Sequence, residues 1–179
     1  MRDAAGQAAL SQLLHRLAAA LLPVARQMRA SVLLLPTYSA VYENDAEICE
    51  TFGQLLRGHE VRIACIEDPA LYKAVTGRLC VMVSSRMHPM ILATGMGTPV
   101  VGLAYNGKFE GMFDMLGIPR RMIWLDQVTE QLPDVLAQLI DEAIRANDGL
   151  QQRAARLAEI VSDRTGALLM HTAELARAA

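Results

Sequence analysis

The chain has 179 residues, the length of one ordinary domain, since single domains run to roughly 100 to 200 residues. Hydrophobic residues make up 53% and charged residues 20%, a composition typical of a folded globular chain rather than a disordered one. The formal net charge is −2, so no general positive field exists to attract nucleic acid or an anionic membrane surface. An anionic ligand would therefore need a local binding site.

Cysteine usage points to a reducing compartment. Cys49, Cys65 and Cys80 are far apart in the sequence, and no Cys-x-x-Cys pair indicates a zinc site or a redox motif. The histidines are scattered as well, so we expect neither a metal nor a cofactor. Without an evident targeting segment, the chain is predicted to be cytoplasmic, with peripheral attachment at the inner face of the cell membrane as the alternative.

The N-terminal segment predicts an amphipathic helix over residues 5–29. Apolar side chains repeat there at helical spacing and form one stripe: Leu10, Leu13, Leu14, Leu17 and Leu21. The most apolar part, 17–24, contains Pro23 and is too short for a membrane span, which needs roughly 20 apolar residues. We expect the stripe to pack against a sheet or a partner.

Residues 31–125 alternate short β-branched runs with helical ones, the pattern of an α/β domain built from βαβ units. Strands are predicted at 31–36, 60–66, 79–83, 99–104 and 122–125, and helices at 44–57, 68–77, 86–94 and 108–116. Residues 130–178 predict two further helices, at 130–146 and 150–178. The whole chain, 1–179, is thus interpreted as one Rossmann-like domain with flanking helices.

Strands joined by helical crossovers predict a doubly wound, all-parallel, five-stranded sheet with helices on both faces and strand order 2-1-3-4-5. In such sheets ligands bind outside the carboxyl ends of the strands, where strands one and three part. The loops expected at that edge are 37–45, 84–88 and 105–108. Most polar and ionisable residues in the middle of the chain lie in these loops, so the functional site is sought there.

The segment from Ser84 to His88 lies where a strand ends and a helix begins. Free backbone N–H groups and the helix dipole favour an anion there, and Ser84, Ser85 and Arg86 add further donors. His88 can donate a proton near neutral pH. A simpler interpretation is also open, in which the serines cap the helix, Arg86 pairs with a surface carboxylate and His88 is an ordinary turn residue.

The next strand ends in Tyr105, Asn106, Gly107 and Lys108. If strands three and four are neighbours, about 4.8 Å apart, Lys108 can reach the same crevice as Arg86. Such a pocket suits a small substrate with more than one negative charge, for example a phosphorylated acid. In the first loop, Tyr38, Glu43 and Asp45 could contact substrate, although Asn44 or Asp45 as a helix cap would explain much of this pattern.

The segment from Val81 to Lys108, followed by Met115-Leu-Gly117, resembles the signature of the polysaccharide pyruvyl transferase family. The shared features are an Arg-x-His at the start of a helix, a small residue before Pro-Val at the next strand, and a lysine shortly afterwards. Leu33-Leu-Leu-Pro36 and Asp45 also resemble this family's C-terminal half. The similarity is clearest over 32–125 and looser in the flanking helices.

The resemblance implies a fold and an activity. Members have two Rossmann-like domains in a GT-B-like arrangement, and they transfer a pyruvyl group from phosphoenolpyruvate to two sugar hydroxyls as a cyclic ketal. By resemblance, His88 is the general acid, Arg86 holds the carboxylate or phosphate, and Lys108 stabilises the leaving phosphate. The implied acceptor is a saccharide or lipid-linked saccharide, in exopolysaccharide biosynthesis for the cell envelope.

The chain departs from the family pattern in side chains and in extent. Met87 and Pro89 replace more usual residues, and Glu110 places an acid near the proposed anion site. The chain accounts for one domain, so we expect a missing N-terminal domain, or a second chain, to complete the cleft. Two alternatives stay open: a GT-B glycosyltransferase domain that binds a sugar nucleotide, and a non-catalytic binding module that forms a homodimer through the leucine stripe.

Overall fold

The computed structural model describes residues 4–37, 39–40, 43–127 and 132–146. Its helices are α1 (Ala4–Gln27), α2 (Asp45–Leu55), α3 (Pro69–Thr76), α4 (Met87–Gly95), α5 (Lys108–Leu116) and α6 (Leu132–Arg145), with a 3₁₀ turn, η1, at Leu125–Gln127. Its strands are β1 (Val32–Leu34), β2 (Ser39–Ala40), β3 (Glu43–Asn44), β4 (Val61–Ile63), β5 (Met82–Ser84), β6 (Val100–Ala104) and β7 (Met122–Trp124). The predicted helix at 150–178 lies outside the described residues.

The sequence places the helices well because their caps are local signals. Asp68 accepts hydrogen bonds from the N–H groups of Ala70 (2.8 Å) and Leu71 (3.4 Å), and the proline that follows starts α3, as the Asp-Pro pair predicts. Helix α5 begins and ends at the predicted residues, and Gly117 closes it with a left-handed φ of 63°.

The sheet differs from the prediction of five paired strands. β1 pairs with β4, and β5, β6 and β7 form a second sheet; all of these pairings are parallel. The order within each piece agrees with 2-1-3-4-5, but β1 and β5 are not hydrogen-bonded strands in the structure as described. β1 is only three residues long, and the chain then reaches Pro36, which has no N–H to extend a ladder.

A short antiparallel pair lies in the loop after β1, where no strand was predicted. Ser39 pairs with Asn44 and Ala40 with Glu43, so β2 and β3 form a small hairpin directly before α2. The first of the three loops expected at the site is therefore partly ordered by its own backbone pairing.

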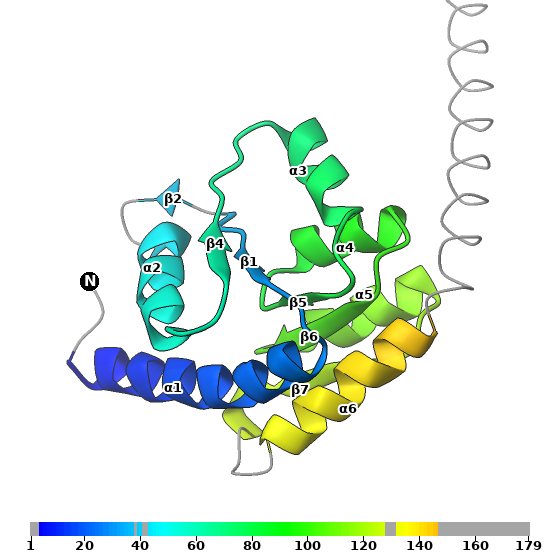
Figure 1. The fold of residues 1–179 in the computed structure, drawn as a ribbon. Helices are drawn as coiled ribbons and strands as arrows, with labels where there is room; N and C mark the ends of the chain where they lie inside the picture. The colour runs from blue at the N-terminus through cyan, green and yellow to red at the C-terminus, as the bar shows by residue number, and fades with distance from the viewer. Residues whose placement is uncertain (1–3, 38, 41–42, 128–131, 147–179) are drawn as a thin grey trace, which may run out of the picture.

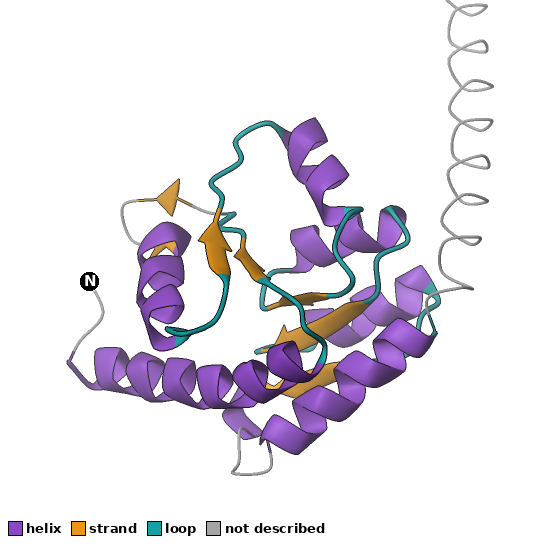
Figure 2. Ribbon diagram, in the orientation of Figure 1, coloured by secondary structure: helices purple, strands orange, loops and turns teal. Residues whose placement is uncertain are grey.

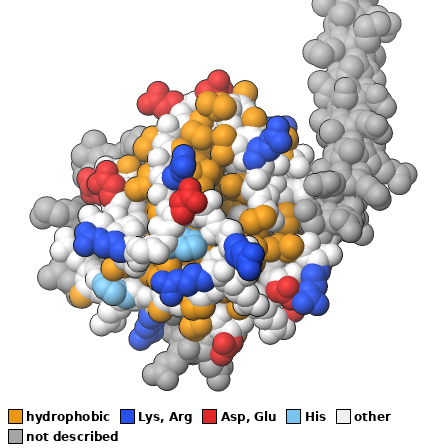
Figure 3. Space-filling view, in the orientation of Figure 1, with side chains coloured by type: hydrophobic (Ala, Val, Ile, Leu, Met, Phe, Trp, Pro, Cys, Tyr) orange, Lys and Arg blue, Asp and Glu red, His pale blue; other side chains and the backbone are white. Residues whose placement is uncertain are grey.

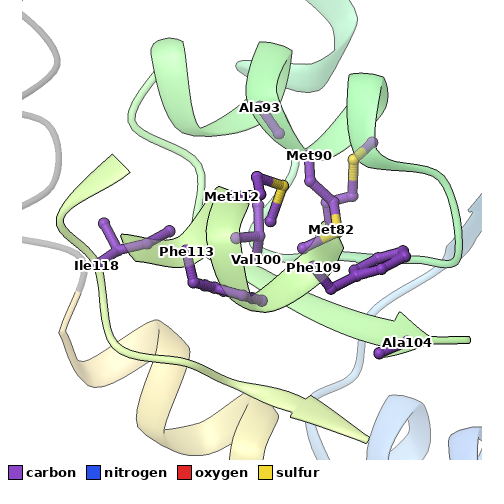
Figure 4. Packing of buried hydrophobic residues seen from close by; sticks show 9 residues of the cluster. All are labelled: Met82, Met90, Ala93, Val100, Ala104, Phe109, Met112, Phe113 and Ile118. Atoms are coloured by element: carbon purple, nitrogen blue, oxygen red, sulfur yellow. The ribbon is translucent and has the colours of Figure 1, made fainter. Parts of the chain in front are cut away.

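Helices cover both faces of the three-stranded sheet, as predicted for a parallel sheet (Figures 1 and 2). On one face, α4 and α5 pack with β5 and β6 around the buried residues Met90, Phe109 and Phe113 (Figure 4). On the other, α1 and α6 pack on β6 and β7 around Val101 and Leu136. The partly buried Leu35, directly after β1, packs against the first of these clusters.

The leucine stripe of α1 is used inside the fold. Leu14 is buried, and Leu17 and Leu21 pack against the cluster that α1 shares with α6. Within the described residues, Gly6–Gln27 is long and apolar enough to cross a membrane by length and composition alone, a test that core helices of soluble proteins also pass. Packing against α6 and the sheet accounts for part of this apolar character, since 28% of the apolar window is buried in the fold and Leu10 and Leu13 line a surface hollow.

Candidate functional site

The turn between β5 and α4 is held together by Ser84. Its Oγ accepts a hydrogen bond from the Arg86 N–H (3.0 Å) and donates one to the Arg86 carbonyl oxygen (3.1 Å). The backbone of Arg86 is thereby fixed in an extended conformation immediately before the helix. The serines were expected to cap the helix, but the Ser84 hydroxyl instead holds the turn before it, and no side chain caps α4 at its N-cap position.

The N-terminus of α4 has no side-chain cap at its N-cap position. Arg86 occupies that position, and its side chain makes no capping hydrogen bond. The third helical residue is Pro89, which has no N–H, so the capless first turn offers the N–H groups of Met87 and His88. The side chain of His88 is exposed and that of Ser85 is half-buried. This end of the helix favours an anion.

The guanidinium of Arg86 is held by Asp45, the first residue of α2. Its Nη2 lies 2.8 Å from Asp45 Oδ1, and the two side chains are 35% and 14% exposed. The ion pair joins the loop after β1 to the turn after β5, so it connects the two parallel sheets at their carboxyl ends. Arg86 does pair with a carboxylate, but not with the surface one that the simpler interpretation expected: its partner is the largely buried Asp45 of the site's own first loop.

Hydrogen bonds also hold the Asp45 carboxylate from its other side. Its Oδ2 accepts hydrogen bonds from the Thr37 N–H (3.3 Å) and the Thr37 Oγ1 (3.1 Å). Burial by itself would raise the pKa of Asp45. The hydrogen bond and charge of Arg86, together with the hydrogen bonds from Thr37, outweigh burial and hold that pKa below its ordinary value of 3.8. Asp45 therefore stays ionised at neutral pH.

Asn44, rather than Asp45, caps α2. The Asn44 Oδ1 accepts a hydrogen bond from the Ala46 N–H (3.1 Å), and its Nδ2 donates to the Glu47 side chain (3.1 Å). The two candidate cap residues thus have different roles: Asn44 caps α2, and Asp45 pairs with Arg86. The pairing of Asp45 with Arg86 was missed from sequence, and the only signal for it was a carboxylate next to a residue able to cap the helix.

The turn between β6 and α5 supplies the second group of predicted residues. The Asn106 Oδ1 accepts a hydrogen bond from the Lys108 N–H (3.1 Å), which orders the start of α5. The exposed ring of Tyr105 packs edge-on against Phe109, with ring centroids 5.6 Å apart. The side chain of Lys108 is exposed.

Strand pairing brings the two turns to the same edge of the sheet. β5 and β6 are parallel neighbours with Ser84 opposite Gly102, so 84–88 and 105–108 both follow carboxyl ends of adjacent strands. The structure therefore places the predicted residues of both turns at one edge, with Asp45 joined to them through Arg86.

Glu110 points toward a different set of charges. Its Oε1 accepts a hydrogen bond from Arg120 Nη1 (3.2 Å), and Arg120 also pairs with Asp114. The acid that departs from the family pattern is therefore partly neutralised by a surface arginine. Figure 3 shows basic and acidic side chains interspersed on one face of the molecule, in agreement with the small net charge.

Two titratable groups, the half-buried Cys49 and the buried Tyr72, lie within electrostatic range of Asp45. Burial, followed by the charges of Asp45 and Cys65, raises the pKa of the Cys49 thiol to about 11. Burial, followed by the influence of Cys49 and Asp45, raises the pKa of Tyr72 to about 12. Both groups are therefore protonated at neutral pH and add no negative charge beside that of Asp45.

Surface hollows lie away from the two turns. One, of about 320 Å³, is lined by α1 and by Leu125 and Asp126; another, of about 400 Å³, lies between α2 and β4. Neither is lined by residues of the predicted site. The described residues contain no group of three or more His, Cys, Asp or Glu side chains able to hold a metal ion.

The family comparison agrees with the resemblance. The family model for polysaccharide pyruvyl transferase matches residues 5–107, which include α1, both parallel sheets up to β6, and the Arg86-x-His88 turn. The match reaches further toward the N-terminus than the similarity noted in the sequence, and it ends one residue before Lys108. Comparison with curated proteins and with solved structures gave no match. Because the family model covers more than half of the chain, this chain belongs to the polysaccharide pyruvyl transferase family.

Proposed function

We propose that this chain binds phosphoenolpyruvate at the carboxyl edge of β5 and β6 and serves in pyruvyl transfer to the hydroxyls of a saccharide or lipid-linked saccharide. The observation that carries the proposal is the Arg86-x-His88 turn at the capless N-terminus of α4, in a chain of the pyruvyl transferase family. A helix N-terminus with an arginine beside it suits a ligand that carries both carboxylate and phosphate.

The proposed chemistry assigns one task to each residue. His88 donates a proton to the methylene carbon of phosphoenolpyruvate, which leaves a cationic centre at the adjacent carbon. One acceptor hydroxyl attacks that centre and loses its proton, which restores the acid form of His88. A second hydroxyl displaces phosphate, its proton leaves with the phosphate, and a cyclic ketal forms. Arg86 holds the anionic donor, while Lys108 and the N-terminus of α4 stabilise the departing phosphate.

The remaining predicted residues have mainly positioning roles in this proposal. The Ser84 hydroxyl is used by the backbone of Arg86, and the Asn106 carbonyl is used by the N–H of Lys108. Both therefore hold the shape of the turns. Ser85 and Tyr105 lie beside these turns and border the proposed donor site. The acceptor would approach from the same edge, and the N-terminal domain expected from the family would cover it.

The alternatives are less well supported by the geometry. A sugar-nucleotide site needs a carboxylate directed at ribose hydroxyls, whereas Asp45 is paired with Arg86 and Glu110 with Arg120. A homodimer through the α1 stripe would need Leu17 and Leu21, which pack against the cluster shared with α6. The donor-binding interpretation is supported by the two turns that follow adjacent parallel strands.

Calorimetric titration with phosphoenolpyruvate tests the proposal. We expect the parent chain to bind, and Arg86→Ala and Lys108→Ala each to weaken binding about 10- to 100-fold, since a hydrogen bond to a charged group contributes about 1.5 to 3 kcal/mol. His88→Asn should retain donor binding and lose turnover, because it removes the acid and keeps the anion site.

Arg145→Ala is the matched control, because it removes an exposed arginine that pairs with Asp141 on α6, away from both turns. Its affinity should equal that of the parent. Binding of a sugar nucleotide in place of phosphoenolpyruvate would instead assign the chain to glycosyl transfer, and equal affinity in parent and Arg86→Ala would remove this turn from the donor site.

A further inference from the structure

We propose that Asp45 is a positioning residue of the donor site: it orients the guanidinium of Arg86 toward the anion bound at the N-terminus of α4. The inference rests on the proposed function and adds to it a residue outside the Arg-x-His motif. It assigns the loop after β1 a direct part in donor recognition.

The first argument is that Asp45 serves a purpose other than capping. The first residue of a helix often supports the helix end, but Asn44 already accepts the hydrogen bond from the Ala46 N–H. The Asp45 carboxylate instead reaches Arg86, 41 residues later in the sequence, with a separation of 2.8 Å. A carboxylate that is only 14% exposed needs compensation for its lost hydration, and Arg86 supplies part of it.

The second argument concerns how firmly the pair is held. Hydrogen bonds from Thr37 fix the carboxylate from one side, and the Ser84 hydroxyl fixes the backbone of Arg86 from the other. An arginine fork recognises carboxylate and phosphate by direction as well as charge, so a fixed partner sets which way the fork faces. Arg86 is thus restrained at both its backbone and its guanidinium before a ligand arrives.

The third argument is the place of the pair in the fold. β1 and β5 belong to different sheets in the described structure, so their backbone ladder does not align the two loops at this edge. The Asp45–Arg86 pair joins these loops directly. Loss of the carboxylate would therefore free the fork to move relative to the helix N-terminus, and small displacements of binding groups are costly.

Asp45→Asn tests the inference, since it keeps the size of the side chain and removes its charge. We expect affinity for phosphoenolpyruvate to fall roughly tenfold or more, measured by calorimetry on the full chain. Asp114→Asn is the matched control, because it makes the same change in the exposed pair with Arg120, and its affinity should equal that of the parent.

Arg86→Lys separates a positioning role from a general structural one. Lysine keeps the positive charge but lacks the planar fork, so the Lys variant has nothing for Asp45 to orient. In that background, Asp45→Asn should change the affinity by less than about threefold, which a double-mutant cycle detects as coupling. An equal loss in both backgrounds overturns the inference, and so does tighter binding by Asp45→Asn, which would show that Asp45 competes with the ligand for Arg86.

Thr37→Val provides a milder variant if Asp45→Asn does not fold. It removes the hydroxyl bonded to Asp45 Oδ2 and leaves every charge in place. We expect a loss of about threefold in affinity, and unchanged affinity overturns the inference. If the parent itself does not bind phosphoenolpyruvate, the proposed function fails and this inference with it. If the parent binds, Arg86→Ala does not, and Asp45→Asn matches the parent, the inference alone fails.

Discussion

Individual side chains at the site differ in how far their roles follow from residue type. The cap of α3 by Asp68 follows from short-range chemistry, so the sequence predicts it, whereas Ser84 was expected to cap α4 and instead holds the turn before that helix. The ion-pair partner of Arg86 is not predictable in this way, because any of several acids in the loops could lie beside it after folding. Glu110 illustrates the converse: it is close to the site in sequence, yet it pairs with Arg120.

Cysteine reactivity offers a test at this scale. Because burial and nearby charges raise the pKa of Cys49 to about 11, it has little thiolate at pH 8, whereas Cys65 and Cys80 are exposed. We expect iodoacetamide to label Cys65 and Cys80 well before Cys49, with peptide mass spectrometry as the measurement. Labelling of Cys49 should accelerate as the pH approaches 11. Equal rates at the three cysteines would contradict the burial of Cys49.

Helices and strands were predictable to different degrees. The range of α5 coincides with its prediction, because caps and glycines mark helix ends locally. Strands were predicted longer than they are: the apolar run 79–83 was expected to pair, but β5 covers Met82–Ser84. An apolar run reports burial, whereas pairing also requires a neighbour in register, which lies elsewhere in the chain.

The contribution of the Asp68 cap to the stability of α3 can be measured. Asp68→Ala removes the acceptor for the first N–H groups of α3 and should lower the free energy of unfolding by about 1 kcal/mol. Urea unfolding followed by circular dichroism measures this change. Glu67→Ala, which removes the adjacent exposed acid, serves as control and should leave stability close to that of the parent. Equal effects of the two variants would argue against the cap.

For the whole molecule, the parallel α/β architecture and the common edge of the two turns were predictable, and the continuous sheet was not. The prediction of strand order used topology rules that hold within each piece. Whether β1 joins β5 depends on contacts over long sequence distances, such as Leu35 against the α4–α5 cluster. β1 and β5 share no backbone ladder, and the Asp45–Arg86 ion pair joins the loops that follow them.

Stability should therefore depend on pH through Asp45. Its pKa in the folded chain lies below the ordinary value of 3.8, so its contribution is present above about pH 4 and is lost as the pH falls through the folded value. We expect Asp45→Asn to be less stable than the parent at pH 7, and the difference to shrink below pH 3.8. Urea unfolding of both chains across this range measures it. A difference independent of pH would exclude the carboxylate charge as its cause.

Because both turns lie within one short segment, that segment is suited to exchange between family members. Met82 to Lys108 spans the uninterrupted β5–α4–β6 unit and both turns, so it could be transplanted as one cassette to test the proposed donor recognition. The exception is Asp45, which lies 41 residues before its partner Arg86. A chimera that takes the cassette without a matching residue at position 45 would inherit the motif and lose the group that holds its arginine.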